Sequence, residues 1–223
     1  MFYKEIVCLA NSRKLNGKCV AGKDISTHNW IRPISGSEKG ELTDDQIAYG
    51  NGEIPELLDI VKIPFEQTKA TFYQTENILI SNGKWEKIGK YSENELDDLC
   101  DSPPTIWINE GLRNDRISED FLERNRIESS LLLIKIESLK FKRENRTDEF
   151  GNTKKKLRAI FSYNNVEYNL VVTDPVIENE YRNKDIGIYV SNSKNAYLCI
   201  SLGEPFNGYC YKLVAGVIKN ISS

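Results

Sequence analysis

Basic residues gather near the start of the chain in a pattern that suits the binding of an anion. Arg13, Lys14, Lys18 and Arg32 lie among glycines, and Asp24 is the one acidic residue between positions 8 and 35. Cationic side chains bind phosphate groups, together with backbone N–H groups that glycine allows to come close. The stretch lacks the G-x-x-x-x-G-K-[ST] pattern of a P-loop. These bases either coat a solvated surface or bind an anionic partner.

An aromatic residue lies beside this basic cluster. Trp30 and Arg32 are two residues apart, which on a strand directs both side chains to one face. Such a pair can stack a nucleobase and hold its phosphate, as single-strand binders do. The alternative is that Trp30 anchors the core while Arg32 pairs with a carboxylate such as Asp44 or Asp45. Ser12 is a further candidate contact in the cluster.

Charge is distributed unevenly along the chain, although its net charge is only −3. Residues 1–40 have a net charge of +4, residues 41–66 of −6, and residues 135–158 of +5. Such segregation can form a basic groove on an acidic molecule. The second basic segment, from "KFKREN" to "TKKKLR", either follows a nucleic-acid backbone or protects an exposed strand edge from aggregation.

A third candidate region is the stretch "CISLGEPFNGYCYKLVAG" at 199–216. Tyr209 and Tyr211 alternate along one strand face, and Ser201 and Lys212 are polar residues close to apolar runs. The stretch either lines a binding pocket or makes a tight connection between two strands. In the first case, Lys212 binds phosphate and Tyr211 stacks on a base.

Motifs for catalysis and metal binding are weak. The single histidine, His28, lies in a polar turn, and the sequence contains no H-E-x-x-H, G-x-S-x-G or G-x-G-x-x-G pattern. The five cysteines have no C-x-x-C spacing, and several lie within apolar runs, which indicates reduced and buried thiols. We therefore expect no metal, no cofactor and no catalytic residue, and a binding protein rather than an enzyme.

Short apolar runs rich in strand formers must position these residues. Strands are expected at 2–10, 18–25, 29–35 and 57–67, and again in several runs from residue 130 to 219. Asn82-Gly83 and Asn164-Asn165 predict hairpin turns. Between the two strand-rich regions, Ser92 and Ser118 are candidate N-caps of two short helices.

This pattern predicts two small barrels. We expect an N-terminal barrel at 1–90, a helical connector at 91–127 and a C-terminal barrel at 128–223. Apolar runs are too short for a membrane span, and no signal-peptide pattern opens the sequence, so we expect a cytoplasmic protein without a membrane partner.

Four stretches carry a family resemblance: "CLANSRKLNGKCVAGKDI", "WIRPIS", "VVTDP" and "YLCISLGEPFNGYCYKLVAGVI". Together they resemble the bacterial dual-OB-domain family, a module of two OB barrels encountered around prokaryotic conflict and defence genes. The resemblance implies two OB folds and, by analogy with other OB folds, the binding of nucleic acid or nucleotides. OB barrels also bind sugars and proteins.

The sequence thus predicts an all-β fold with minor helix: two OB-like barrels joined by a short helical segment. The predicted function is nucleic-acid recognition in a prokaryotic defence system, with nucleic acid and other defence-system proteins as partners. The alternatives are a sensor of a small phosphorylated ligand or modified nucleotide, and a protein adaptor. The predicted nucleic-acid or phosphate contacts are Ser12, Arg13, Lys14, Lys18, Trp30, Arg32 and Lys212, with Tyr211 stacking. This site requires the cations to meet in one groove while the acids face elsewhere.

Overall fold

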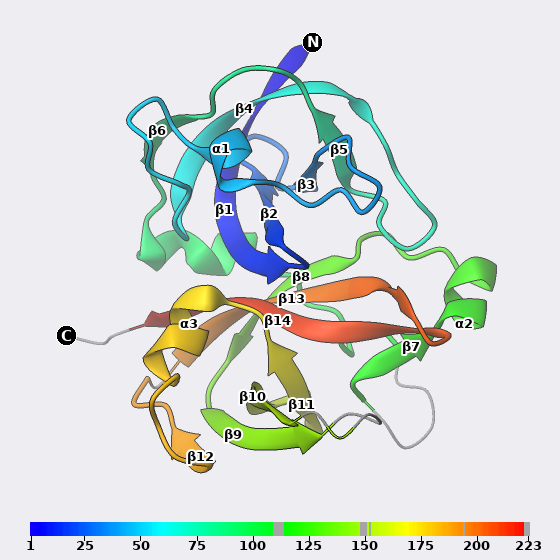
Figure 1. Cartoon of the computed structure of the whole chain (residues 1–223), viewed down its shortest axis with the longest axis vertical. Coiled ribbons are helices and arrows are strands. Elements are labelled where there is room, and N and C mark those ends of the chain that lie inside the picture. Colours follow the sequence, from blue (N-terminus) through cyan, green and yellow to red (C-terminus); the bar gives the residue numbers. More distant parts are fainter. Residues whose placement is uncertain (109–113, 148–150, 152, 194, 221–223) are drawn as a thin grey trace.

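The first half of the chain forms a closed five-stranded barrel (Figure 1). The computed structural model describes residues 1–108, 114–147, 151, 153–193 and 195–220. The strands of the first sheet are β1 (Phe2–Lys14), β2 (Gly17–Asp24), β3 (Trp30–Ile34), β4 (Asp59–Thr68), β5 (Asn77–Ile80) and β6 (Glu86–Lys90). They follow the order β1-β2-β3-β5-β4-β6, and β4 also pairs with β1, which closes the barrel. The pair β3–β5 is parallel, and the short helix α1 (Asp44–Ile47) lies between β3 and β4.

The second half repeats this topology. Its strands are β8 (Leu131–Ile136), β9 (Leu139–Thr147), β10 (Thr153–Tyr163), β11 (Val166–Val172), β12 (Gly187–Val190), β13 (Asn195–Phe206) and β14 (Tyr209–Asn220), with helix α3 (Pro175–Glu180) after β11. The path runs from β9 through β10, β11, β14 and β13 to β8, which leads back into β9 after two residues. The pair β11–β14 is parallel, like β3–β5. Both halves have the OB strand order, so the predicted fold is confirmed.

Strand alternation builds a separate core in each barrel. Along β10 the side chains of Leu157, Ala159 and Phe161 are buried, whereas the residues between them are partly exposed. Full burial of a large apolar side chain contributes about 1.5–3 kcal/mol, so these inward positions specify which face of the strand meets the core. The outward positions of the same strand include Lys154, Lys156 and Arg158.

The described residues between β6 and β8 contribute to both barrels. They contain the 3-10 helix η1 (Glu93–Leu99), strand β7 (Arg116–Ser118) and helix α2 (Glu119–Arg124). Ser92 and Ser118 accept hydrogen bonds from backbone N–H groups as N-caps, as predicted. Strand β7 pairs with β14. In the part of the chain that the structure describes, no helix has the length and apolar character required to cross a membrane.

One predicted hairpin is wrong. Asn82-Gly83 lies between β5 and β6, but these two strands do not pair with each other in the described sheets. β5 pairs with β3 and with the C-terminal part of β4, while β6 pairs with the N-terminal part of β4. After the turn the chain therefore continues along the same edge of β4, the edge opposite β1. At Asn164-Asn165 the prediction is confirmed, since β10 and β11 pair up to Tyr163 opposite Val166.

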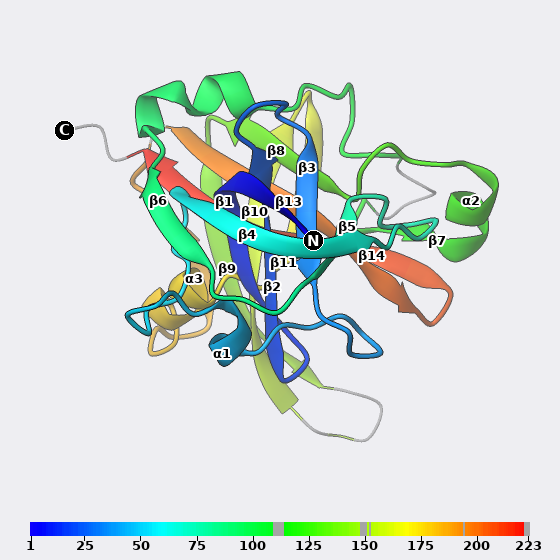
Figure 2. The same cartoon turned by 90° about the horizontal axis from the view of Figure 1, so that it is seen from above.

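The two barrels pack directly on each other through β1 and β14 (Figures 1 and 2). Both strands have a β-bulge here, at Leu9 in β1 and at Ala215 in β14. A Cβ atom built on Gly216 would lie 2.2 Å from the carbonyl oxygen of Leu9, so the two backbones touch. An apolar cluster from both barrels and from η1 surrounds this contact and includes Leu99 and Leu133.

Candidate functional site

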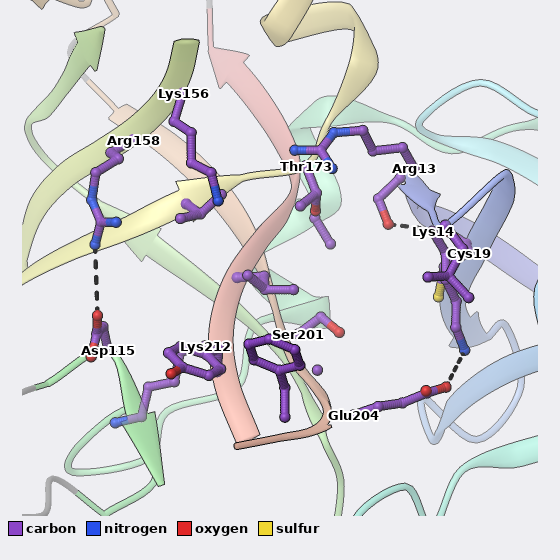
Figure 3. A pocket seen from close by; sticks show the side chains of 18 of the residues that line it. Arg13, Lys14, Cys19, Asp115, Lys156, Arg158, Thr173, Ser201, Glu204 and Lys212 are labelled. Atoms are coloured by element: carbon purple, nitrogen blue, oxygen red, sulfur yellow. Dashed lines mark hydrogen bonds and ion pairs between the residues drawn. The ribbon is translucent and has the colours of Figure 1, made fainter. Parts of the chain in front are cut away.

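A cavity of about 760 Å³ lies between the barrels, beside the β1–β14 contact. The β1–β2 hairpin forms one wall, strands β10 and β11 form another, and the β13–β14 hairpin closes the third side (Figure 3). Among the described residues, eight basic and two acidic side chains line it. The excess of cations makes this groove positive on a protein whose net charge is −3, and anions are therefore attracted to it.

The cavity brings together both basic segments of the sequence. Ser12, Arg13 and Lys14 reach it from the first segment, and Arg146, Lys154, Lys156 and Arg158 reach it from the second. Of the predicted contacts, Arg32, Tyr211 and Lys212 also line it, whereas Lys18 and Trp30 do not. Several of these residues, however, are already engaged by other groups.

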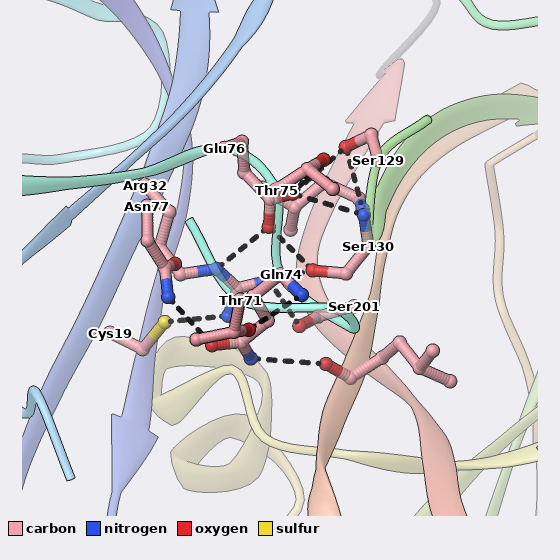
Figure 4. A network of polar contacts seen from close by, with 12 residues as sticks. Cys19, Arg32, Thr71, Gln74, Thr75, Glu76, Asn77, Ser129, Ser130 and Ser201 are labelled. Carbon is pink, nitrogen blue, oxygen red and sulfur yellow. Dashed lines mark hydrogen bonds and ion pairs between the residues drawn. The ribbon is translucent and has the colours of Figure 1, made fainter. Parts of the chain in front are cut away.

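Arg32 has a structural role, and its geometry does not favour the predicted contact with phosphates. Its side chain is buried, and Nε donates to Oε1 of Glu76 at 3.0 Å. Its Nη2 donates to the hydroxyl groups of Ser130 and Ser201 in the second barrel, at 2.7 and 3.3 Å (Figure 4). Glu76 also accepts from the backbone N–H and the hydroxyl of Ser130. The network ties the barrels together beneath the cavity.

The charge state of Glu76 is set by the groups that surround its carboxylate. Burial alone would raise the pKa of Glu76. The Arg32 guanidinium and the two hydrogen bonds from Ser130 lower this pKa by more than burial raises it, so the net shift is downward. The pair is therefore ionised at neutral pH. A guanidinium held in this way is not available to a ligand.

Trp30 and Lys212 also have partners within the protein, and this geometry does not favour their predicted role as phosphate contacts. Trp30 Nε1 donates to Asp101 at 3.0 Å, and Lys23 lies 5.2 Å from the centre of its ring. Lys212 is 1% exposed and turns away from the cavity, with Nζ donating to the carbonyl oxygen of Ile108 at 2.9 Å (Figure 3). The alternative that Trp30 supports the packing of the protein fits this geometry.

Arg13 and Lys14 point into the groove but have carboxylate partners. Arg13 Nε lies 2.8 Å from Oε2 of Glu178 on α3, and Lys14 Nζ lies 2.8 Å from Oε1 of Glu204 on β13. The prediction that acids would face elsewhere is thus wrong for these two carboxylates. The Arg13 side chain remains 53% exposed, so its pair is in contact with water.

The remaining positive charge lies on the β9–β10 hairpin. Arg146 and Lys154 are directly opposite each other in the ladder, and like charges in such a pair are destabilising. Lys156 is half-buried in the cavity wall, and its pKa is lowered by burial and then by Arg146, Arg13 and other cations. No carboxylate pairs with these three residues in the described part of the chain. An anion bound here would relieve the repulsion.

The tips of the two hairpins offer apolar surface to the cavity. Phe206, at the end of β13, is 64% exposed, and Leu15, in the β1–β2 turn with φ +50°, is 71% exposed. Tyr211 also lines the cavity, but the Arg116 guanidinium lies 4.6 Å from its ring centre and donates to its hydroxyl group. Phe206 therefore presents the freer aromatic surface, although the sequence argument pointed to Tyr211.

Small polar groups form the floor of the cavity. Ser12, Thr173 and Ser201 line the cavity and are nearly buried, and Cys19 lies beside them with a free thiol. The Ser12 hydroxyl donates to the carbonyl oxygen of Cys19 at 3.4 Å. The cavity thus has a cationic wall, apolar hairpin tips and a floor of hydroxyl groups.

A family model described as the dual OB-containing domain matches residues 4–217, which include both barrels and the groove. The chain belongs to this family. A search of curated proteins found no match. The dual OB-containing domain is a module for binding, since OB barrels present ligand sites on their strands and loops. The family match therefore agrees with a binding groove but leaves the ligand to be argued from the groove itself.

Proposed function

We propose that the groove between the two OB barrels binds single-stranded nucleic acid. The observation that carries this proposal is the group Arg146, Lys154 and Lys156, which faces the cavity without carboxylate partners among the described residues. Phosphate contacts from lysine and arginine supply most of the affinity in sequence-independent binding. The setting in prokaryotic defence rests on the family resemblance alone.

The exposed aromatic side chain at the rim of the cavity favours a single strand over a duplex as the ligand. Phe206 is exposed at the rim, and an aromatic ring can stack only on a base whose face is free. The bases of a duplex are stacked on each other, so the duplex would use only the cationic wall. A single strand can place its phosphates on β10 and a base on Phe206.

Reversing the charge of the cationic wall tests the proposal. Lys156→Glu combined with Arg146→Glu should weaken the binding of a single-stranded oligonucleotide at least about 30-fold at about 0.1 M salt, because two phosphate contacts become repulsive. The slope of log K against log salt should also become shallower by about 1.4. Fluorescence anisotropy titrations at several salt concentrations measure both quantities.

The matched control is Arg124→Glu with Arg126→Glu, which makes the same change in net charge on the exposed surface of the connector, outside the cavity. Equal losses in the two double variants would show that only overall charge matters. An unchanged affinity of the groove variant would contradict the proposed site. Circular dichroism confirms that both variants are folded.

The affinity should also depend on pH through Lys156. Its pKa in the free protein is lowered by burial and by the neighbouring cations, whereas a bound phosphate favours the charged amine. As the pH rises above this lowered pKa, binding requires the uptake of a proton, so affinity falls with increasing pH. Lys156→Arg should keep its charge and remove this dependence in the alkaline range below the ordinary pKa of lysine. Anisotropy titrations of both proteins across this range provide the measurement.

A small phosphorylated ligand is the second candidate. The cavity volume of about 760 Å³ is within the range of small-molecule sites, and the hydroxyl floor could read a sugar or a base. A thermal-shift panel that compares mononucleotides with single-stranded oligonucleotides separates the candidates. Stabilisation by mononucleotides alone would favour the small ligand, and stabilisation by neither would favour a protein partner.

A further inference from the structure

A second, smaller cavity of about 350 Å³ adjoins the groove on the other side of strand β10. One wall is the β9–β10 sheet, which contributes Arg143 and Lys155, and the other is α3 with the turn that follows it, which contributes Arg182.

The two cavities share a residue. Lys156 lines both, so its half-buried side chain forms part of the boundary between them. The other part is an ion pair across that boundary: Arg13 lines the groove, Glu178 lines the second cavity, and the two side chains meet at 2.8 Å. The division between the cavities therefore consists of side chains that can rearrange.

Positive charge continues through the second cavity. Lys155 and Arg182 are exposed there and have no ion-pair partner in the described part of the chain. Arg143 donates to the carbonyl oxygens of Tyr181 and Lys184 and so fixes the turn that carries Arg182. Glu178 is the one acidic residue among the described lining residues, and it is turned towards Arg13.

The Arg13–Glu178 pair is of a kind that a phosphate can replace. Both side chains are partly exposed, at 53% and 28%, and ion pairs in contact with water contribute little to stability. A phosphate offers Arg13 the same charge and the same bidentate geometry as a carboxylate. Glu178 thus occupies the place that an anion would take on Arg13.

We propose that the second cavity is a further phosphodiester-binding subsite, so that a bound single strand continues past Lys156 and displaces Glu178 from Arg13. This inference rests on the proposed function. A ligand of about three nucleotides fills only the groove, whereas a strand of about twelve nucleotides, within the range of an OB-fold site, extends to Arg182. Glu178 competes with the longer ligand and weakens its binding in the native protein.

The test compares these two lengths of oligothymidine in anisotropy and competition titrations with the full chain. Arg182→Glu should weaken the binding of the long strand about fivefold and leave the short one unchanged. Arg124→Glu, an equal charge change on an exposed side chain of α2, should leave both unchanged. Glu178→Gln should strengthen the binding of the long strand about threefold, while Glu180→Gln, which removes a partner of Lys219 outside both cavities, should not.

The failure of this inference can be distinguished from that of the proposed function. If the wild-type chain binds both lengths but Arg182→Glu changes neither or weakens both equally, the second subsite is refuted while the groove stands. If the wild-type chain binds neither length, the proposed function is refuted and the subsite with it. Circular dichroism is needed only as a check, because Arg182 and Glu178 lie outside the buried core.

Discussion

Replacement of Glu76 by alanine should lower the free energy of unfolding by about 3–5 kcal/mol. The substitution leaves the guanidinium of Arg32 buried between the barrels without its counter-charge, and removal of one partner of a buried pair has a cost of this size. The backbone N–H and hydroxyl of Ser130 also lose their acceptor. Urea denaturation followed by circular dichroism measures the change.

The exposed pair Asp120–Arg124 is the control for this substitution. Its two side chains are 80% and 79% exposed, so Asp120→Ala should change the free energy of unfolding by less than about 0.5 kcal/mol. Similar losses for Glu76→Ala and Asp120→Ala would contradict the structural role of the Arg32 network.

The same network fixes the sign of a pH dependence. The pKa of Glu76 is lower in the folded protein than in the unfolded chain, so its contribution to stability is complete above the unfolded pKa. The contribution is lost as the pH falls through the folded value. The difference in stability between wild type and Glu76→Ala should therefore shrink in acid, and a difference that grew in acid would contradict the downward shift.

Gly216→Val is expected to destabilise the chain by about 3 kcal/mol or more. A Cβ atom at this position would lie 2.2 Å from the Leu9 carbonyl oxygen. The Cβ position is fixed by the backbone of β14 and the oxygen belongs to the backbone of β1, so no side-chain rotation relieves the clash. Overpacking in a buried contact usually costs about 1–3 kcal/mol, and here strand β14 must also separate from β1. Thermal and urea unfolding measure the loss, and limited proteolysis detects looser packing of the barrels.

Gly89→Ala provides the matched control for Gly216→Val. Gly89 is also a strand glycine, but a Cβ atom there would meet only a side-chain atom of Ile60, at an ordinary 3.5 Å. Its substitution should be neutral within about 0.5 kcal/mol. If Gly216→Val were as mild as this control, the close backbone contact between the barrels would be refuted.

Local patterns were enough to predict the architecture. Strand runs, the Asn164-Asn165 turn and the caps at Ser92 and Ser118 depend on neighbouring residues, and the structure confirms them. The Asn82-Gly83 hairpin is wrong for a reason of the same kind: a turn sequence specifies a bend, but the pairing of the flanking strands depends on β4, which comes earlier in the chain.

The site was predictable only in its position. Basic residues of two distant segments do meet in one cavity, yet their roles depend on carboxylates that are remote in sequence. Arg32 is neutralised by a residue 44 positions away, and Arg13 by one 165 positions away. Amino-acid type cannot indicate such partners, so the sequence did not distinguish the free Lys156 from the engaged Arg32.

The contact between the two bulges also bears on how a ligand in the cavity would affect the stability of the protein. Leu9 lies in one barrel and Ala215 in the other, while Arg13 and Thr173, joined by a backbone hydrogen bond of 3.0 Å, stand where the cavity begins. In the described part of the chain, strand β1 runs from the contact between the barrels directly into the wall of the cavity. A ligand bound in the cavity would therefore contact both barrels and would stabilise the folded protein against their separation.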